Sequence, residues 1–212
     1  MERFPAVVEF GPPCAGKGTA GSALAENLSA FHHISSGDLV RGILDKGGIL
    51  ANKLHSFVDN GILIPDDVIL PILRDEVKKR VETGIYNPEK QILLADGMYR
   101  TRGQAKSLED FLDVKEVYHF TNLPNIILMQ RNNTRVLESK DKKKPRTDDH
   151  EKAMKRRIQE YYSDTHPTLD YFVEKKIPIF CVDALPPKDV VFNTLHRYAI
   201  FKIPVYRDVV RA

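Results

Sequence analysis

The feature that most constrains this chain is a glycine-rich loop near its start, Gly11-Pro12-Pro13-Cys14-Ala15-Gly16-Lys17-Gly18-Thr19. The apolar run 6–10 before it predicts a strand, and the apolar spacing of 19–28 after it predicts a helix. Such a unit directs backbone N–H groups and a helix N-terminus at an anion. Lys17 would reach the β- and γ-phosphates of a bound nucleotide, and Thr19 offers a hydroxyl to a phosphate or to Mg²⁺. The loop therefore predicts a phosphate site.

Other apolar runs predict the rest of a parallel sheet. They lie at 33–34, 91–95, 116–120 and 177–182, and the segments between them are long enough for helices. We expect those helices at 36–46, 49–60, 66–83, 103–111, 122–135, 148–175 and 188–199. Alternation of this kind is typical of an α/β protein whose parallel sheet, here of about five strands, is covered by helices on both faces.

Composition narrows the class of protein. The 212 residues are 42% hydrophobic and 29% charged, which suits a single globular domain spanning 1–212. A net charge of +3 does not favour a nucleic-acid partner. No apolar run reaches the length of a membrane span, and no signal region precedes the first strand, so we expect no membrane association and a cytoplasmic protein. Two cysteines, Cys14 and Cys181, do not form a spaced set and predict no structural zinc.

Several arginines and one aspartate are candidates for the chemistry at such a loop. Transfer of a phosphoryl group depends on alignment and on positive charge around the moving oxygens, which arginine supplies. Arg131 and Arg135 are four residues apart, so both lie on one face of a helix. Asp96 ends an apolar run at the carboxyl edge of a predicted strand, where ligands of open α/β sheets bind. A helix-capping or turn aspartate is the alternative for Asp96.

The ordered motifs of the chain resemble the adenylate kinase family, in its short-lid form. The similar segments are Gly16-Lys17-Gly18-Thr19, the flap boundaries 33–41 and 61–69, the Asp-Gly-Met-Tyr-Arg-Thr run 96–101 with Gln104, and the lid flanks 130–135, 145–149 and 155–157. The resemblance covers nearly the whole chain. It implies a P-loop NTPase-type fold with a core of 1–35, 65–131 and 146–212, a monophosphate-binding flap of 36–64 and a lid of 132–145.

The resemblance also implies roles for individual residues in MgATP-to-AMP phosphoryl transfer. The implied catalytic residues are Lys17, Arg100, Arg131, Arg135, Arg146 and Arg157. The implied ATP-binding residues are Pro13, Cys14, Ala15, Gly16, Lys17, Gly18, Thr19, Arg131, Arg135 and Pro186. The implied AMP-binding residues are Ser36, Arg41, Ile62, Leu63, Ile64, Gly97, Met98, Tyr99, Arg100, Gln104, Arg146 and Arg157. Asp96 would hold Mg²⁺ through water, with Thr19 as a second candidate, and the family's habit makes a monomer the default.

The chain departs from the family pattern at four places. Cys14 stands where the family usually has glycine, and Met98-Tyr99 replaces Phe-Pro, so the proline that sets this turn is missing. Asn132 and its neighbour Asn133 replace leucines. Glu9 lies within a predicted buried strand, where an ionised carboxylate needs a partner, and we expect a nearby Arg or Lys.

Three functions remain open at this point. Ser36 and Gln104 favour adenine as the acceptor base, because an amide can form two hydrogen bonds to an adenine edge. A UMP/CMP kinase or a kinase of broad specificity is the near alternative. A nucleotide-binding relative with weak or lost catalysis is the distant one, supported by Cys14 and Tyr99. The retained Lys17, Asp96 and arginines argue against it, since a binding module needs no charges placed for a transition state.

Overall fold

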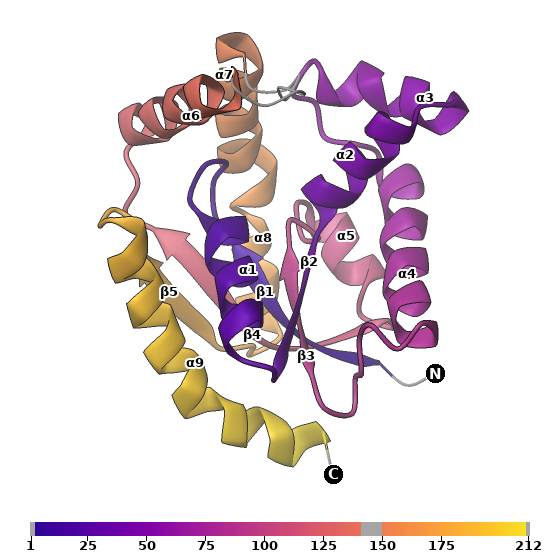
Figure 1. Cartoon of the computed structure of the whole chain (residues 1–212), viewed down its shortest axis with the longest axis vertical. Helices are drawn as coiled ribbons and strands as arrows, with labels where there is room; N and C mark the ends of the chain where they lie inside the picture. Colours follow the sequence, from indigo (N-terminus) through magenta and orange to yellow (C-terminus); the bar gives the residue numbers. More distant parts are fainter. Residues whose placement is uncertain (1–2, 141–149, 211–212) are drawn as a thin grey trace.

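Five parallel strands form one sheet in the order β2-β3-β1-β4-β5 (Figure 1). The structure is a computed structural model and describes residues 3–140 and 150–210. The strands are β1 (Phe4–Phe10), β2 (Phe31–Ser35), β3 (Ile92–Asp96), β4 (Leu112–Thr121) and β5 (Ile179–Asp183). The predicted parallel α/β sheet is confirmed. β4 begins four residues before the predicted run, because residues 112–115 (Leu-Asp-Val-Lys) alternate between apolar and polar residues and so do not extend a continuous apolar run.

The helices cover the two faces and one end of this sheet. They are α1 (Lys17–Asn27), α2 (Ser36–Lys46), α3 (Ile49–Val58), α4 (Asp66–Glu82), α5 (Arg102–Ser107), α6 (Asn125–Lys140), α7 (Glu151–Glu160), the π-helix η2 (Tyr161–Thr165), α8 (Thr168–Glu174) and α9 (Lys188–Val210). Across the described residues, none of them is long and apolar enough to cross a membrane.

Four helix predictions were wrong in their extent. The helix expected over 103–111 ends at Ser107, and the helix expected over 122–135 runs from Asn125 to Lys140. The helix expected over 148–175 is divided into α7, η2 and α8, and its first two residues lie outside the described part of the chain. Pro167 follows the π-helical turn and lacks the N–H that a continuous helix needs. The helix expected to end at 199 continues to Val210, and Ile203 in this extension packs against the hydrophobic core.

Alternate side chains of the strands build two hydrophobic layers. Val8 of β1 and Leu93 of β3 join one layer under α4, α5 and α8. Val7 and Leu94 join the other layer, under α1 and α9. Figure 1 accordingly shows α1 and α9 on one side of the sheet and α4 on the other. A sheet buried on both faces holds its carboxyl edge rigidly, and that edge carries the candidate site.

The strand register brings three chain segments together at this edge. Asp96 is the register partner of both Glu9 and Ser35. The loop after β1, the start of α2 and the loop after β3 therefore meet above neighbouring strands. In Figure 1 the pair α2–α3 lies to one side of this edge, and α6 and α7 lie to the other.

Candidate active site

The loop between β1 and α1 has the backbone that its glycines predict. Gly11 has a φ of 147°, and a Cβ atom there would lie 2.8 Å from the carbonyl oxygen of Phe120 on β4, so only glycine fits. Nζ of Lys17 donates hydrogen bonds to the carbonyl oxygens of Gly11 and Pro12, each at 2.8 Å. Lys17 is thereby folded back over the loop at the start of α1, and burial lowers its pKa.

Cys14 adopts the left-handed conformation that the glycine of the family pattern would adopt more easily. Its φ is 61°, a region that costs a non-glycine residue roughly 1–2 kcal/mol. Its Sγ lies 3.9 Å from Oδ1 of Asn132 on α6. Two departures from the family pattern, at positions 14 and 132, therefore contact each other.

A chain of hydrogen bonds organises the candidate acceptor side. Oγ of Ser36 and Nε of Arg100 both donate to the carbonyl oxygen of Gly97, at 2.9 Å and 3.2 Å. The backbone N–H of Arg100 donates to Oε1 of Gln104 at 2.8 Å. Nε2 of Gln104 donates to Oδ1 of Asp66 at 2.8 Å. Residues from α2, the loop after β3, α5 and α4 thus form one connected network.

Two arginines extend from α6 toward the same edge. Nη2 of Arg131 donates to the carbonyl oxygens of Ala184 and Leu185, which follow β5, at 2.7 Å and 3.3 Å. Nη2 of Arg135 donates to Oδ1 of Asn132 at 3.1 Å. Asn132 is fully buried, so its side chain ties Arg135 to the helix and to the loop at once.

A single cavity of about 1490 Å³ brings the predicted residues together. Its lining includes Pro13, Cys14, Ala15, Gly16, Lys17, Gly18, Thr19, Ser36, Arg41, Ile62, Leu63, Ile64, Asp96, Gly97, Tyr99, Arg100, Gln104, Arg131, Arg135, Arg157 and Pro186. Ligand pockets commonly measure about 300–1,000 Å³, so this cavity has room for more than one small molecule.

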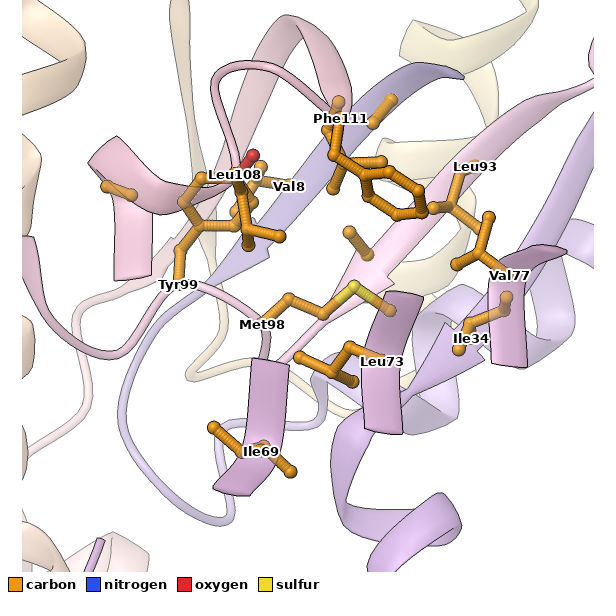
Figure 2. Packing of buried hydrophobic residues seen from close by; sticks show 14 of the residues in the cluster. Val8, Ile34, Ile69, Leu73, Val77, Leu93, Met98, Tyr99, Leu108 and Phe111 are labelled. Carbon is orange, nitrogen blue, oxygen red and sulfur yellow. The ribbon is translucent and has the colours of Figure 1, made fainter. Parts of the chain in front are cut away.

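Two predicted site residues are not placed in that lining. Arg146 lies outside the described residues, as do 141–145 of the predicted lid. The side chain of Met98 points into the core, where Figure 2 shows it beside Leu73. Because this apolar side chain is only 1% exposed, the AMP-binding role expected of Met98 falls to its backbone and stays a prediction. Its peptide bond to Tyr99 is trans, and Tyr99 packs on Phe172 with ring centroids 5.4 Å apart.

Glu9 meets a histidine rather than the Arg or Lys that the sequence predicted. Nε2 of His33 lies 3.2 Å from Oε2 of Glu9, a close ion pair that is not aligned as a hydrogen bond. Burial raises the pKa of Glu9 to about 7, while the contact with His33 and the charge of Lys17 oppose the rise. The sequence missed His33 because two histidines follow each other on β2, and only the register shows which one faces Glu9.

Only two side chains are assigned to a divalent cation, those of Asp96 and Thr19. Oδ2 of Asp96 lies 3.2 Å from where a Cβ atom on Gly18 would be, so the carboxylate reaches over the start of α1, where Thr19 lines the same cavity. Among the described residues, no three His, Cys, Asp or Glu side chains converge as a metal cage. One carboxylate and one hydroxyl fit Mg²⁺, which is usually held by one or two protein oxygens, substrate phosphates and water.

Asp66 and Asn132 are the polar contributors that sequence reasoning did not assign to the site. Asp66 was noticed only as the start of a helix and as part of the flap boundary 61–69, and Asn132 only as a replacement for leucine. The role of each residue comes from contacts with residues distant in sequence or on the next turn of the helix, which the sequence does not show.

Fold and site together define a class of protein. A parallel sheet with a glycine-rich phosphate loop at its carboxyl edge is the P-loop NTPase arrangement, and the arginines around the cavity suit phosphoryl transfer. The family model described as adenylate kinase matches residues 9–177. The chain therefore belongs to the adenylate kinase family, and it is a phosphotransferase that acts on nucleoside monophosphates.

Three similar proteins give the extent of the match. An adenylate kinase of Thermus thermophilus is 31% identical over 195 residues, covering 91% of this chain and 95% of that protein. That of Hyphomonas neptunium is 30% identical over 174 residues, covering 81% and 86%. That of Treponema denticola is 30% identical over 203 residues, covering 86% and 93%. The family model thus spans the glycine-rich loop, strands β2 to β4 and helices α1 to α8 around the cavity.

Proposed function

We propose that the protein transfers the γ-phosphoryl group of MgATP reversibly to AMP, giving two ADP. One observation carries the proposal: a single cavity is lined both by the phosphate loop with Lys17 and by the network of Ser36, Arg100 and Gln104. Its volume of about 1490 Å³ exceeds that of an ordinary single-ligand pocket, which suits two nucleotides facing each other.

The donor triphosphate would lie in the loop at the N-terminus of α1. There the backbone N–H groups and the helix dipole favour its negative charge. Lys17 already sits on the loop through the Gly11 and Pro12 carbonyls, and exchange of these contacts for the β- and γ-phosphates would bring its charge onto the reacting group. Arg131 contacts the carbonyl oxygen of Leu185, the residue before Pro186, and both Arg131 and Pro186 line the cavity, where they would border the donor base.

The acceptor would lie between α2 and the loop after β3. Arg41 and Arg100 would hold its phosphate, and Ile62 to Ile64 would flank its base. Arg135, Arg157 and Arg146 would surround the phosphoryl group in transit. Positive charges that meet the transition state more closely than the ground state accelerate the chemical step.

Asp96 and Thr19 would hold Mg²⁺ together with the phosphates, Asp96 through water. When bound, the ion neutralises charge on the β- and γ-oxygens and aligns them. The part played by the chain is to keep the Asp96 carboxylate over the start of α1, which the pairing of β3 with β1 achieves.

Segments 36–64 and 132–145 would act as the moving flap and lid over a core of 1–35, 65–131 and 146–212. Closure would exclude water and complete the ring of arginines. In the described chain, the flap already touches the residue that caps α7: Nε2 of His150 lies 2.9 Å from the carbonyl oxygen of Asp59.

A panel of acceptors tests this proposal. ADP formation from ATP would be measured in a coupled assay with AMP, UMP, CMP or GMP, and we expect AMP to give the highest kcat/KM. A preference for UMP or CMP would assign the protein to the pyrimidine branch instead. If no acceptor supported turnover while ATP still bound, the protein would be a nucleotide-binding relative without catalysis.

A further inference from the structure

The side-chain amide of Gln104 is held at both ends by partners that each act in one way only. Its Nε2 donates to Oδ1 of Asp66 at 2.8 Å, and an ionised carboxylate can only accept. Its Oε1 accepts from the backbone N–H of Arg100 at 2.8 Å, and that group can only donate. If the amide turned over, its oxygen would face the carboxylate of Asp66 and its N–H group would face the backbone N–H of Arg100. Neither contact is a hydrogen bond, so the orientation of the amide is locked.

Asp66 and the backbone of Gln104 are themselves held in place. Oγ1 of Thr101 lies 3.4 Å from Oδ2 of Asp66 and also accepts the backbone N–H of Gln104 at 3.0 Å, which caps α5. Gly103 leaves room for the carboxylate, since a Cβ atom there would lie 2.9 Å from Oδ2 of Asp66. Gln104 is 3% exposed, so water competes little for these bonds.

The locked amide keeps one N–H and one oxygen lone pair for a ligand. Gln104 lines the cavity, so these two groups are available to a base edge there. A 6-amino purine presents a donor on its exocyclic nitrogen and an acceptor at N1. A 6-oxo purine presents the same pair in reverse order. A free amide satisfies either base by turning over, whereas a locked amide matches only one of them.

We propose that Asp66 is a specificity-determining positioning residue: by locking the amide of Gln104, it makes the acceptor site select a 6-amino purine monophosphate over its 6-oxo counterpart. The inference rests on the proposed function, because it takes AMP as the acceptor. Asp66 touches no substrate in this account and acts only through Gln104.

AMP and IMP are the matched probes, since their bases differ only in the amino or oxo group at position 6 and in protonation at N1. We expect the wild type to favour AMP over IMP in kcat/KM. In Asp66→Asn the new amide can accept as well as donate, so only the backbone N–H of Arg100 still opposes a turn of the Gln104 amide, and the ratio should fall by about tenfold or more. The change should lie in KM, with kcat for saturating AMP little altered.

Asp67→Asn is the matched control. Asp67 is exposed, lies beside Asp66 in the first turn of α4 and contributes the same charge to the helix N-terminus, but it has no contact with Gln104 among the described residues. Its AMP-to-IMP ratio should equal that of the wild type. Asp66→Ala serves as a second variant if Asp66→Asn unfolds, and equilibrium binding of AMP and IMP supplies the ratio without turnover.

Two results would overturn the inference. Wild-type activity with AMP combined with an unchanged AMP-to-IMP ratio in folded Asp66→Asn would refute the lock and leave the proposed function intact. Absence of wild-type turnover with AMP would refute the proposed function and the lock together.

Discussion

The imidazole of His33 lies 3.2 Å from the carboxylate of Glu9; the Glu9 side chain is fully buried and that of His33 is 10% exposed. Burial raises the pKa of Glu9 to about 7. Burial alone would lower the pKa of His33, but its contact with Glu9 outweighs that effect and raises it. Both groups therefore hold a proton more tightly in the folded protein than in the unfolded chain.

The pair predicts how stability depends on pH. A pKa raised by folding contributes stability at low pH, and this contribution is lost as pH rises through the folded value. For Glu9 the loss falls between pH 4.5, its ordinary pKa, and about 7. The free energy of unfolding of the wild type, relative to that of Glu9→Gln, should fall by roughly 1–3 kcal/mol across this window. Urea unfolding at several pH values measures the free energy of unfolding of both proteins. If that free energy changed with pH equally in the wild type and in Glu9→Gln, the predicted role of Glu9 would be contradicted.

Gly21 on α1 provides the space for this pair. A Cβ atom at position 21 would lie 2.3 Å from Oε2 of Glu9 and 2.6 Å from the His33 ring, and neither buried side chain can move into solvent. Gly21→Ala should therefore destabilise the protein by about 1–3 kcal/mol, despite the helix propensity of alanine.

Gly42→Ala is the control for that substitution. Gly42 lies inside α2, and nothing would lie within 4 Å of an added Cβ atom. The variant should be neutral or more stable by up to about 1 kcal/mol. Thermal unfolding of both variants decides the point, and equal melting temperatures for the two would remove the steric argument.

Lys17 and Arg100 are expected to act on the reacting phosphates. Lys17→Ala and Arg100→Ala should each lower kcat by about 10²-fold or more, because each removes a positive charge that the transition state needs. Arg102→Ala is the matched control for Arg100→Ala, since Arg102 is exposed and pairs with Glu174 away from the cavity. Near-normal rates in both site variants, with folding intact, would remove the assigned roles.

Cys14 combines strain with a position at the phosphates. Cys14→Gly should relieve the left-handed strain and raise stability by about 0.5–1 kcal/mol, whereas Cys14→Ala should not. Alkylation with N-ethylmaleimide should inactivate the wild type and spare Cys14→Gly, and ATP should protect against it. Cys181→Ser is the control, because Cys181 is exposed on β5 outside the cavity lining and its loss should leave the sensitivity unchanged.

The parallel sheet and the phosphate loop could be predicted because each has a local pattern, whereas most residues around the cavity were implied by the resemblance to the adenylate kinase family. The run 6–10 followed by Gly11 and Gly16 restricts the backbone to a strand and a turn. The helix expected at 36–46 was confirmed at both ends because Ser35 caps it and glycine follows it. Its apolar spacing and its caps indicated the same boundaries.

The remaining features depend on partners distant in sequence. Which histidine meets Glu9 is decided by the register of β2 on β3, and the burial of Met98 is decided by α4 packing beneath it. Asp66 becomes part of the site only because α4 and α5 bring it to Gln104, 38 residues away in sequence. Such contacts leave no periodic or motif signal in one sequence.

If one cavity takes two nucleotides and moves a phosphoryl group between them, the reaction should also run from two molecules of ADP. The most direct measurement supplies ADP alone with Mg²⁺ and follows the products by ³¹P NMR, with Lys17→Ala purified in parallel to exclude a contaminating enzyme. The account predicts that ATP and AMP appear in equal amounts until equilibrium, and that the variant forms neither at a comparable rate. Unchanged ADP, or ATP without matching AMP, would contradict it.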